Sequence, residues 1–161
     1  MSDDIGIKRM DHVCWAVRSI DDALPMLTEL MGMRVMGRWQ SEEQGFRGVS
    51  LALPGSPPDR DGATHFELLE PLGDDSYLHR FLDERGPGLH HVTFEVADVQ
   101  AAADAMKGYG IEPFGGVQGS HSGYETYIHP KDSGGVLFQF YWDDPNHVHD
   151  HEHDEQSGSP K

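Results

Sequence analysis

The chain has 161 residues, the length of one ordinary domain, and a formal net charge of −16 at pH 7. Such an acidic surface repels nucleic acid and anionic membranes, which argues against both as partners. Cys14 is the single cysteine, so no intramolecular disulfide forms, and we see neither a transmembrane run of about eighteen apolar residues nor a signal peptide, which predicts a cytoplasmic protein.

The sequence repeats itself. Residues 11–17 (DHVCWAV) match residues 90–96 (HHVTFEV), and the match continues from residues 20–23 to residues 99–102. Each copy begins with a short apolar run containing β-branched and aromatic residues, which predicts a strand. A helix follows in each copy, and we expect these helices over residues 21–31 and about 99–108, ended by Gly32 and Gly110.

After each helix the apolar pattern changes to period two, which is typical of strands. The predicted strands cover residues 33–40, 48–53 and 64–70 in the first copy and 111–115, 124–129 and 135–142 in the second. Residues 54–58 and 129–135 are turn-forming, and residues 71–88 connect the copies through a short helix near 77–85.

Each copy is therefore a βαβββ unit, and the fold class is α+β. We expect a single domain over residues 1–144, built from repeats at about 8–72 and 87–142 that form a curved mixed sheet with a cleft. The tail, residues 145–161, is rich in histidine and acidic residues and poor in apolar ones, so we expect it to be disordered and able to bind transition metals without a fold.

The repeat brings chemically active side chains to equivalent positions. His12 and His91 occupy the same place in the two copies, so a pseudo-twofold arrangement would let them meet. The last strand of each copy carries one polar residue in an apolar context, Glu67 in the first and Gln139 in the second. Imidazole and carboxylate ligands suit Zn, Fe, Ni, Co or Mn, which predicts one divalent metal held by His12, Glu67, His91 and the Gln139 amide oxygen.

Other interpretations of these residues stay open. A histidine in a strand can be a hydrogen-bonded core residue, and Glu67 can face water. His90 competes with His91 for the ligand position, but the repeat favours His91 because His90 aligns with Asp11. An alternative for the tail histidines is that they form an adventitious segment with no role in metal storage or delivery.

Several longer motifs resemble the vicinal-oxygen-chelate superfamily, which includes glyoxalase I and extradiol dioxygenases, and most closely its methylmalonyl-CoA epimerase branch. The resemblance rests on Asp11-His12-Val13 and on residues 67–76 (ELLEPLGDDS), 88–92 (GLHHV) and 129–137 (HPKDSGGVL). It covers roughly residues 8–142.

The resemblance implies a metal held by His12, Glu67 and His91, with the fourth family ligand at Gln139. There the family has a glutamate that is also credited with proton transfer, and an amide is a poor base. A replacement must come from elsewhere, and the candidates by segment are Glu42, Glu43, Glu125 and His121.

The function implied is a metal-dependent isomerase or epimerase acting on a proton next to a carbonyl, with an acyl-CoA thioester as the suggested substrate and a homodimer as the suggested assembly. The alternatives are an Fe(II)-dependent dioxygenase, a glyoxalase-type lyase, and a non-catalytic small-molecule binding protein. Selective iron dependence with oxygen uptake would identify the dioxygenase, and tight binding without turnover would identify the binding protein.

Overall fold

The computed structural model describes residues 4–56, 63–120 and 123–145. The first half contains β1 (Ile7–Ala16), α1 (Ile20–Pro25), a π-helical turn η1 (Met26–Leu30), β2 (Arg34–Ser41), β3 (Phe46–Ala52) and β4 (His65–Pro71). After the connecting helix α2 (Leu78–Arg85), the second half contains β5 (Gly88–Val96), α3 (Val99–Tyr109), β6 (Phe114–Ser120), β7 (Gly123–Ile128), α4 (Pro130–Ser133) and β8 (Leu137–Asp143).

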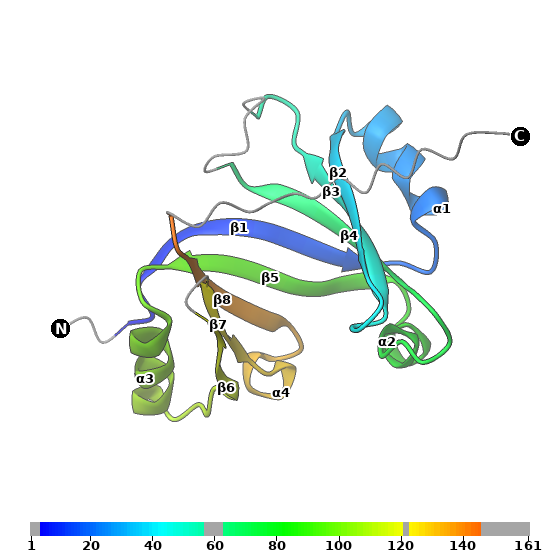
Figure 1. Cartoon of the computed structure of the whole chain (residues 1–161). Coiled ribbons are helices and arrows are strands. Elements are labelled where there is room, and N and C mark those ends of the chain that lie inside the picture. Colours follow the sequence, from blue (N-terminus) through cyan, green and yellow to red (C-terminus); the bar gives the residue numbers. More distant parts are fainter. Residues whose placement is uncertain (1–3, 57–62, 121–122, 146–161) are drawn as a thin grey trace, which may run out of the picture.

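The strands form one eight-stranded mixed sheet in the order β2-β3-β4-β1-β5-β8-β7-β6. β1 and β5 pair antiparallel at its centre, and each of them also pairs in parallel with the last strand of its own half. Figure 1 shows the two halves meeting along β1 and β5, with α1 beside the first half and α3 beside the second. The predicted fold class, two βαβββ units in a curved mixed sheet, is therefore confirmed.

The register proves the internal symmetry residue by residue. His12 faces Thr93 and Cys14 faces His91 across β1 and β5, and these two pairs exchange under the repeat. The parallel pairs repeat as well, because Glu67 lies beside Cys14 on β1 and Gln139 lies beside Thr93 on β5. The symmetry axis thus passes between the two histidines.

Each half has its own hydrophobic core. Ile20 and Leu27 pack with Leu68 in the first half, and Val99 and Met106 pack with Phe140 in the second. A third cluster joins Leu78 and Leu82 of α2 to Cys14, Ala16 and Leu69. The α1 and α3 clusters lie on one face of the sheet, because Leu68 and Phe140 alternate along their strands with the polar residues Glu67 and Gln139. The α2 cluster lies on the opposite face, since Leu69 is two residues from Glu67, and it borders the site there. Within the described ranges, no helix is long and apolar enough to cross a membrane.

Three predicted elements differ from the structure. The helix predicted over 21–31 ends as α-helix at Pro25, which has no N–H to continue the hydrogen-bond ladder, and goes on as η1. The strand predicted over 111–115 was wrong, because β6 begins only after Pro113 and runs to Ser120. The turn predicted over 129–135 contains α4, which the His129 side chain caps by accepting from Lys131 N–H.

Glu70 anchors α1 to the sheet. Its buried carboxylate accepts hydrogen bonds from the Ile20 backbone N–H and from Arg47 Nε. Because Glu70→Ala leaves a buried N–H without its partner, we expect a loss of about 1–3 kcal/mol in the free energy of unfolding, measured by urea denaturation. Glu84→Ala is the control, since its ion pair with Arg80 is exposed to solvent and contributes little to stability. Equal losses in the two variants would contradict the assignment.

Candidate metal centre and cavity

Side chains of both halves line a cavity of about 820 Å³. His12, Glu67, His91 and Gln139 all face it. Its lining also includes Glu42, Glu43, Asp74, Asp75 and Glu125, and no lysine or arginine among the residues that the structure describes. Among the described residues, the cavity lining therefore offers no cationic side chain to an anionic ligand.

Three ligand atoms converge at the centre of this cavity. His12 Nε2, on β1, lies 3.2 Å from His91 Nε2, on β5, and 3.4 Å from Glu67 Oε2, on β4. One ligand atom of each residue lies within 4.8 Å of the others. Two imidazole nitrogens and a carboxylate oxygen that face one point need a proton or a cation between them. This donor set fits a first-row divalent metal.

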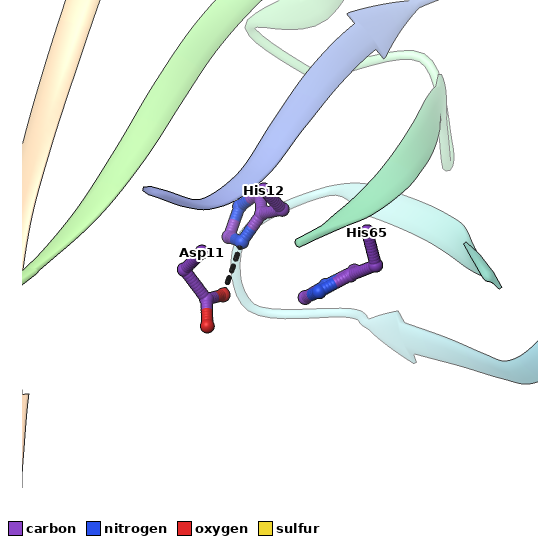
Figure 2. A group of neighbouring side chains, drawn as sticks. All are labelled: Asp11, His12 and His65. Atoms are coloured by element: carbon purple, nitrogen blue, oxygen red, sulfur yellow. Dashed lines mark hydrogen bonds and ion pairs between the residues drawn. The ribbon is translucent and has the colours of Figure 1, made fainter. Parts of the chain in front are cut away.

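Asp11 fixes the ring of His12. The His12 Nδ1–H donates to Asp11 Oδ2 at 2.7 Å, drawn as the dashed line in Figure 2, which directs the lone pair of Nε2 toward the cavity. Asp11 Oδ1 in turn accepts from Tyr141 Oη at 2.8 Å and Arg9 Nη2 at 2.6 Å. Burial alone would raise the pKa of Asp11, but the hydrogen bonds from His12 and Tyr141 outweigh it and hold that pKa well below its usual range.

Glu67 is oriented by two neighbours. Ser50 Oγ–H donates to Oε1 at 3.2 Å and His65 Nε2 lies 3.0 Å from the same oxygen, so Oε2 remains for the convergence point. Burial would raise the pKa of Glu67, but the hydrogen bond with His65 and the nearby His12 and His91 lower it. The carboxylate therefore stays ionised, as a metal ligand must.

His91 is neutral in its surroundings. Burial, with His90 and His12 close by, lowers its pKa to about 3. Its Nδ1 lies 2.8 Å from Nδ1 of His90, so one hydrogen bond joins these two rings and Nε2 of His91 is left facing His12. The repeat favoured His91 over His90, and it is His91 that belongs to the converging group.

A second group of possible ligands, drawn in Figure 2, consists of Asp11, His12 and His65. It shares His12 with the first group. Both carboxylate oxygens of Asp11 are already occupied by His12, Tyr141 and Arg9, whereas Glu67 Oε2 faces the cavity. The first group is therefore the better candidate for a metal site, and Asp11 and His65 are hydrogen-bonded to its members.

Gln139 belongs to a separate hydrogen-bond network beside these ligands. Its Oε1 accepts from the Thr93 hydroxyl at 2.8 Å, and its Nε2 donates to Glu125 Oε2 at 2.7 Å and to Tyr127 Oη at 3.2 Å. Thr93 Oγ1 also lies 3.0 Å from His12 Nε2. The network places Gln139 next to the converging group, and its role as a fourth ligand stays a prediction.

The predicted site residues are therefore largely gathered in one place. Glu125, Glu42 and Glu43 line the cavity with the ligands, whereas His121 lies outside the described residues, as does the tail beyond Pro145. Sequence reasoning did not assign site roles to Asp11, His65, Thr93 or Tyr127. His65 carried a usable signal, because it lies two residues before Glu67 and strand alternation puts both on one face.

The comparisons with known proteins agree with one another. Residues 11–127 match the family profile of the Glyoxalase/Bleomycin resistance protein/Dioxygenase superfamily. An ethylmalonyl-CoA/methylmalonyl-CoA epimerase of Cereibacter sphaeroides is 32% identical over 138 residues, which are 83% of this chain and 96% of that protein.

Solved structures agree with the sequence matches. The crystal structure of methylmalonyl-CoA epimerase from Mycobacterium tuberculosis superposes with a TM-score of 0.72 at 30% identity, covering 90% of this chain and 93% of that one. A variant of the Streptomyces coelicolor methylmalonyl-CoA epimerase in complex with 2-nitronate-propionyl-CoA superposes with a TM-score of 0.70 at 31% identity, covering 84% and 97%.

Proposed function

Because the chain belongs to the Glyoxalase/Bleomycin resistance protein/Dioxygenase superfamily, we propose that it is a metal-dependent epimerase. It would invert the configuration of the carbon next to the carbonyl of an acyl-CoA thioester, with methylmalonyl-CoA as the first substrate to test. The observation that carries this proposal is the convergence of His12 Nε2, His91 Nε2 and Glu67 Oε2 in a cavity that both halves line. The epimerases among its relatives support the choice of reaction.

The proposed ligands are His12, Glu67 and His91. A divalent cation held there would stabilise the negative charge that develops on the thioester oxygen when the α-proton leaves. Neighbouring residues hold the proposed ligands in the tautomer and orientation that metal binding requires. Asp11 holds the tautomer of His12, while Ser50 and His65 hold Glu67 in a single orientation.

Inversion also requires proton transfer on both faces of the α-carbon, because one group removes the proton and another returns one from the opposite side. The hairpin between β2 and β3 brings Glu42 and Glu43 to the cavity from the first half. One of these two carboxylates would act on the first face. The group for the second face must come from the second half.

The test is an epimerisation assay with the purified full-length chain. Protein stripped with a chelator and then given Co²⁺, Zn²⁺, Ni²⁺, Mn²⁺ or Fe²⁺ is mixed with one epimer of methylmalonyl-CoA in D₂O, and deuterium uptake is followed by mass spectrometry. We expect uptake that depends on the added metal. Absence of uptake with every metal, from methylmalonyl-CoA and from simple 2-methylacyl-CoA thioesters, would refute the proposal.

The donor set itself supports one competing candidate. Two histidines and one carboxylate with open positions are the ligands of many non-haem Fe(II) oxygenases. Oxygen consumption that requires Fe²⁺, measured with an oxygen electrode on catechol substrates, would favour that candidate over the epimerase.

A homodimer and a cytoplasmic location remain predictions. The outermost strands of the sheet are β2 and β6, and within the described residues neither has a second neighbour. An unpaired edge can add a strand from another chain. Light scattering on the purified protein measures whether two chains associate.

A further inference from the structure

We propose that Glu125, on β7, is the carboxylate that exchanges a proton with the substrate on the second face of the α-carbon. This inference rests on the epimerase function proposed above. It supplies the proton-accepting group that the second repeat lacks at Gln139, because the uncharged amide of Gln139 is a poor base.

Glu125 lies in the right place for this task. Its side chain lines the cavity together with His12, Glu67 and His91. Hydrogen bonds join its carboxylate to Gln139 and Gln139 to Thr93, whose Oγ1 lies 3.0 Å from His12 Nε2. The carboxylate therefore lines the same cavity as the converging ligands, with Gln139 and Thr93 between it and His12.

Strand register explains how the carboxylate reaches the cavity from β7. Glu125 pairs with Tyr141 and Tyr127 pairs with Gln139 across β7 and β8. Residues two apart on a strand share a face, so Glu125 and Tyr127 project to the side of the sheet on which Gln139 lies. The carboxylate thus lies on β7, one strand outward from β8, where Gln139 is the equivalent of Glu67. Its side chain still lines the same cavity.

The neighbours of Glu125 hold it in a defined position. Gln139 gives one Nε2 hydrogen to Glu125 and the other to Tyr127. Tyr127 is also hydrogen-bonded to Glu125, and burial together with this carboxylate raises the pKa of Tyr127 far above its usual range, so the phenol stays a donor. Gln139 is accordingly a positioning residue, and Glu125 is the group that can take a proton.

The step balances without any further reactant. The α-carbon–hydrogen bond breaks, its proton moves to a carboxylate oxygen of Glu125, and its electron pair enters the enolate of the thioester. A proton from a carboxyl group of the Glu42–Glu43 hairpin then forms a new bond to carbon on the opposite face. After the turnover Glu125 is protonated and the hairpin carboxyl is ionised, so Glu125 gives its proton to water and the hairpin carboxylate takes one from water. In the reverse direction the hairpin carboxylate removes the proton and the protonated Glu125 donates one. Nothing is oxidised or reduced.

The experiment uses full-length protein loaded with the metal that activates it. Glu125→Gln is compared with wild type and with Glu112→Gln, which changes an exposed glutamate outside the cavity lining. Three quantities are measured, namely metal content, the rate of epimerisation, and deuterium uptake from each epimer separately. We expect Glu125→Gln to keep its metal and to lose epimerisation on the order of 100-fold.

Uptake from the two epimers gives the decisive readout. We expect Glu125→Gln to lose uptake from one epimer and to keep it from the other, whose proton faces the first half. A merely structural role would lower both to the same extent, and that result, or unchanged epimerisation, would overturn the inference. If wild type exchanges neither epimer, the proposed function fails and the inference with it. If Glu125→Gln does not fold, Tyr127→Phe tests the same point, with a roughly tenfold loss confined to the same epimer.

Discussion

Replacing His91 with alanine is expected to remove the metal and nearly all epimerase activity. His91 Nε2 supplies one of three converging ligand atoms, and it lies 3.2 Å from His12 Nε2 on the neighbouring strand. Without it, one imidazole and one carboxylate remain, and two such ligands hold a divalent ion weakly. We expect bound metal to fall at least roughly tenfold, and epimerisation to fall on the order of 1,000-fold because the charge developing on the substrate is no longer stabilised.

Metal content is measured by plasma mass spectrometry after gel filtration. We expect the histidine-rich sequence after residue 146 to bind transition metals by itself, so wild type and variant should both carry glutamine in place of His147, His149, His151 and His153. His79→Ala is the matched control, because the Nε2–H of that exposed histidine donates to a loop carbonyl, that of Gly73, and the side chain lies outside the cavity lining. A His91→Ala protein that retains as much metal as this control would show that the ligands are wrong.

Replacing Asp11 with alanine is expected to weaken metal binding 10- to 100-fold while the three ligands stay in place. Asp11 accepts the Nδ1 hydrogen of His12 and is itself held by Tyr141 and Arg9. Without Asp11, His12 can turn or place its proton on Nε2, and that nitrogen is then not available to a metal. Asp11→Asn keeps an oxygen that accepts from His12 but loses the negative charge, so we expect it to fall between wild type and Asp11→Ala.

Isothermal titration with Zn²⁺ or Co²⁺ measures the dissociation constant of each Asp11 variant. Glu95→Gln is the control, since Glu95 is the other carboxylate on Arg9 but does not touch His12. An unchanged dissociation constant in Asp11→Ala would mean that Asp11 does not support metal binding. An equal loss in Glu95→Gln would mean that the charge around Arg9 matters and the tautomer of His12 does not.

Much of the fold and the ligand set could be predicted from the repeat. The match of residues 11–17 with residues 90–96 indicated two strands in equivalent positions, and β1 and β5 pair at the centre of the sheet as that symmetry requires. Glu67 and Gln139 were singled out because each is a polar residue in an apolar context in the last strand of its repeat, and strand alternation placed their side chains. The sequence pattern was sufficient for these predictions, because the strands and the candidate ligands lie at equivalent positions within each repeat.

Helix and strand limits depended on features that periodicity does not contain. Pro25 and Pro113 remove backbone N–H donors, and their effect on η1 and on the start of β6 was underestimated. The helix α4 was missed because it is only one turn long and depends on the His129 cap.

By itself, the sequence determined that this protein is a duplicated βαβββ unit with His12, Glu67 and His91 as candidate ligands, and that position 139 lacks a base. Only the tertiary structure decided which residues support those ligands and where a replacement carboxylate lies. Asp11 meets Tyr141 across 130 residues, and Thr93 joins His12 to Gln139 through pairings on both sides of β5. Such contacts depend on the register of distant strands, and that register is fixed when the two halves pack against each other. The same register brings Glu125 beside Gln139, which no spacing in the sequence reveals.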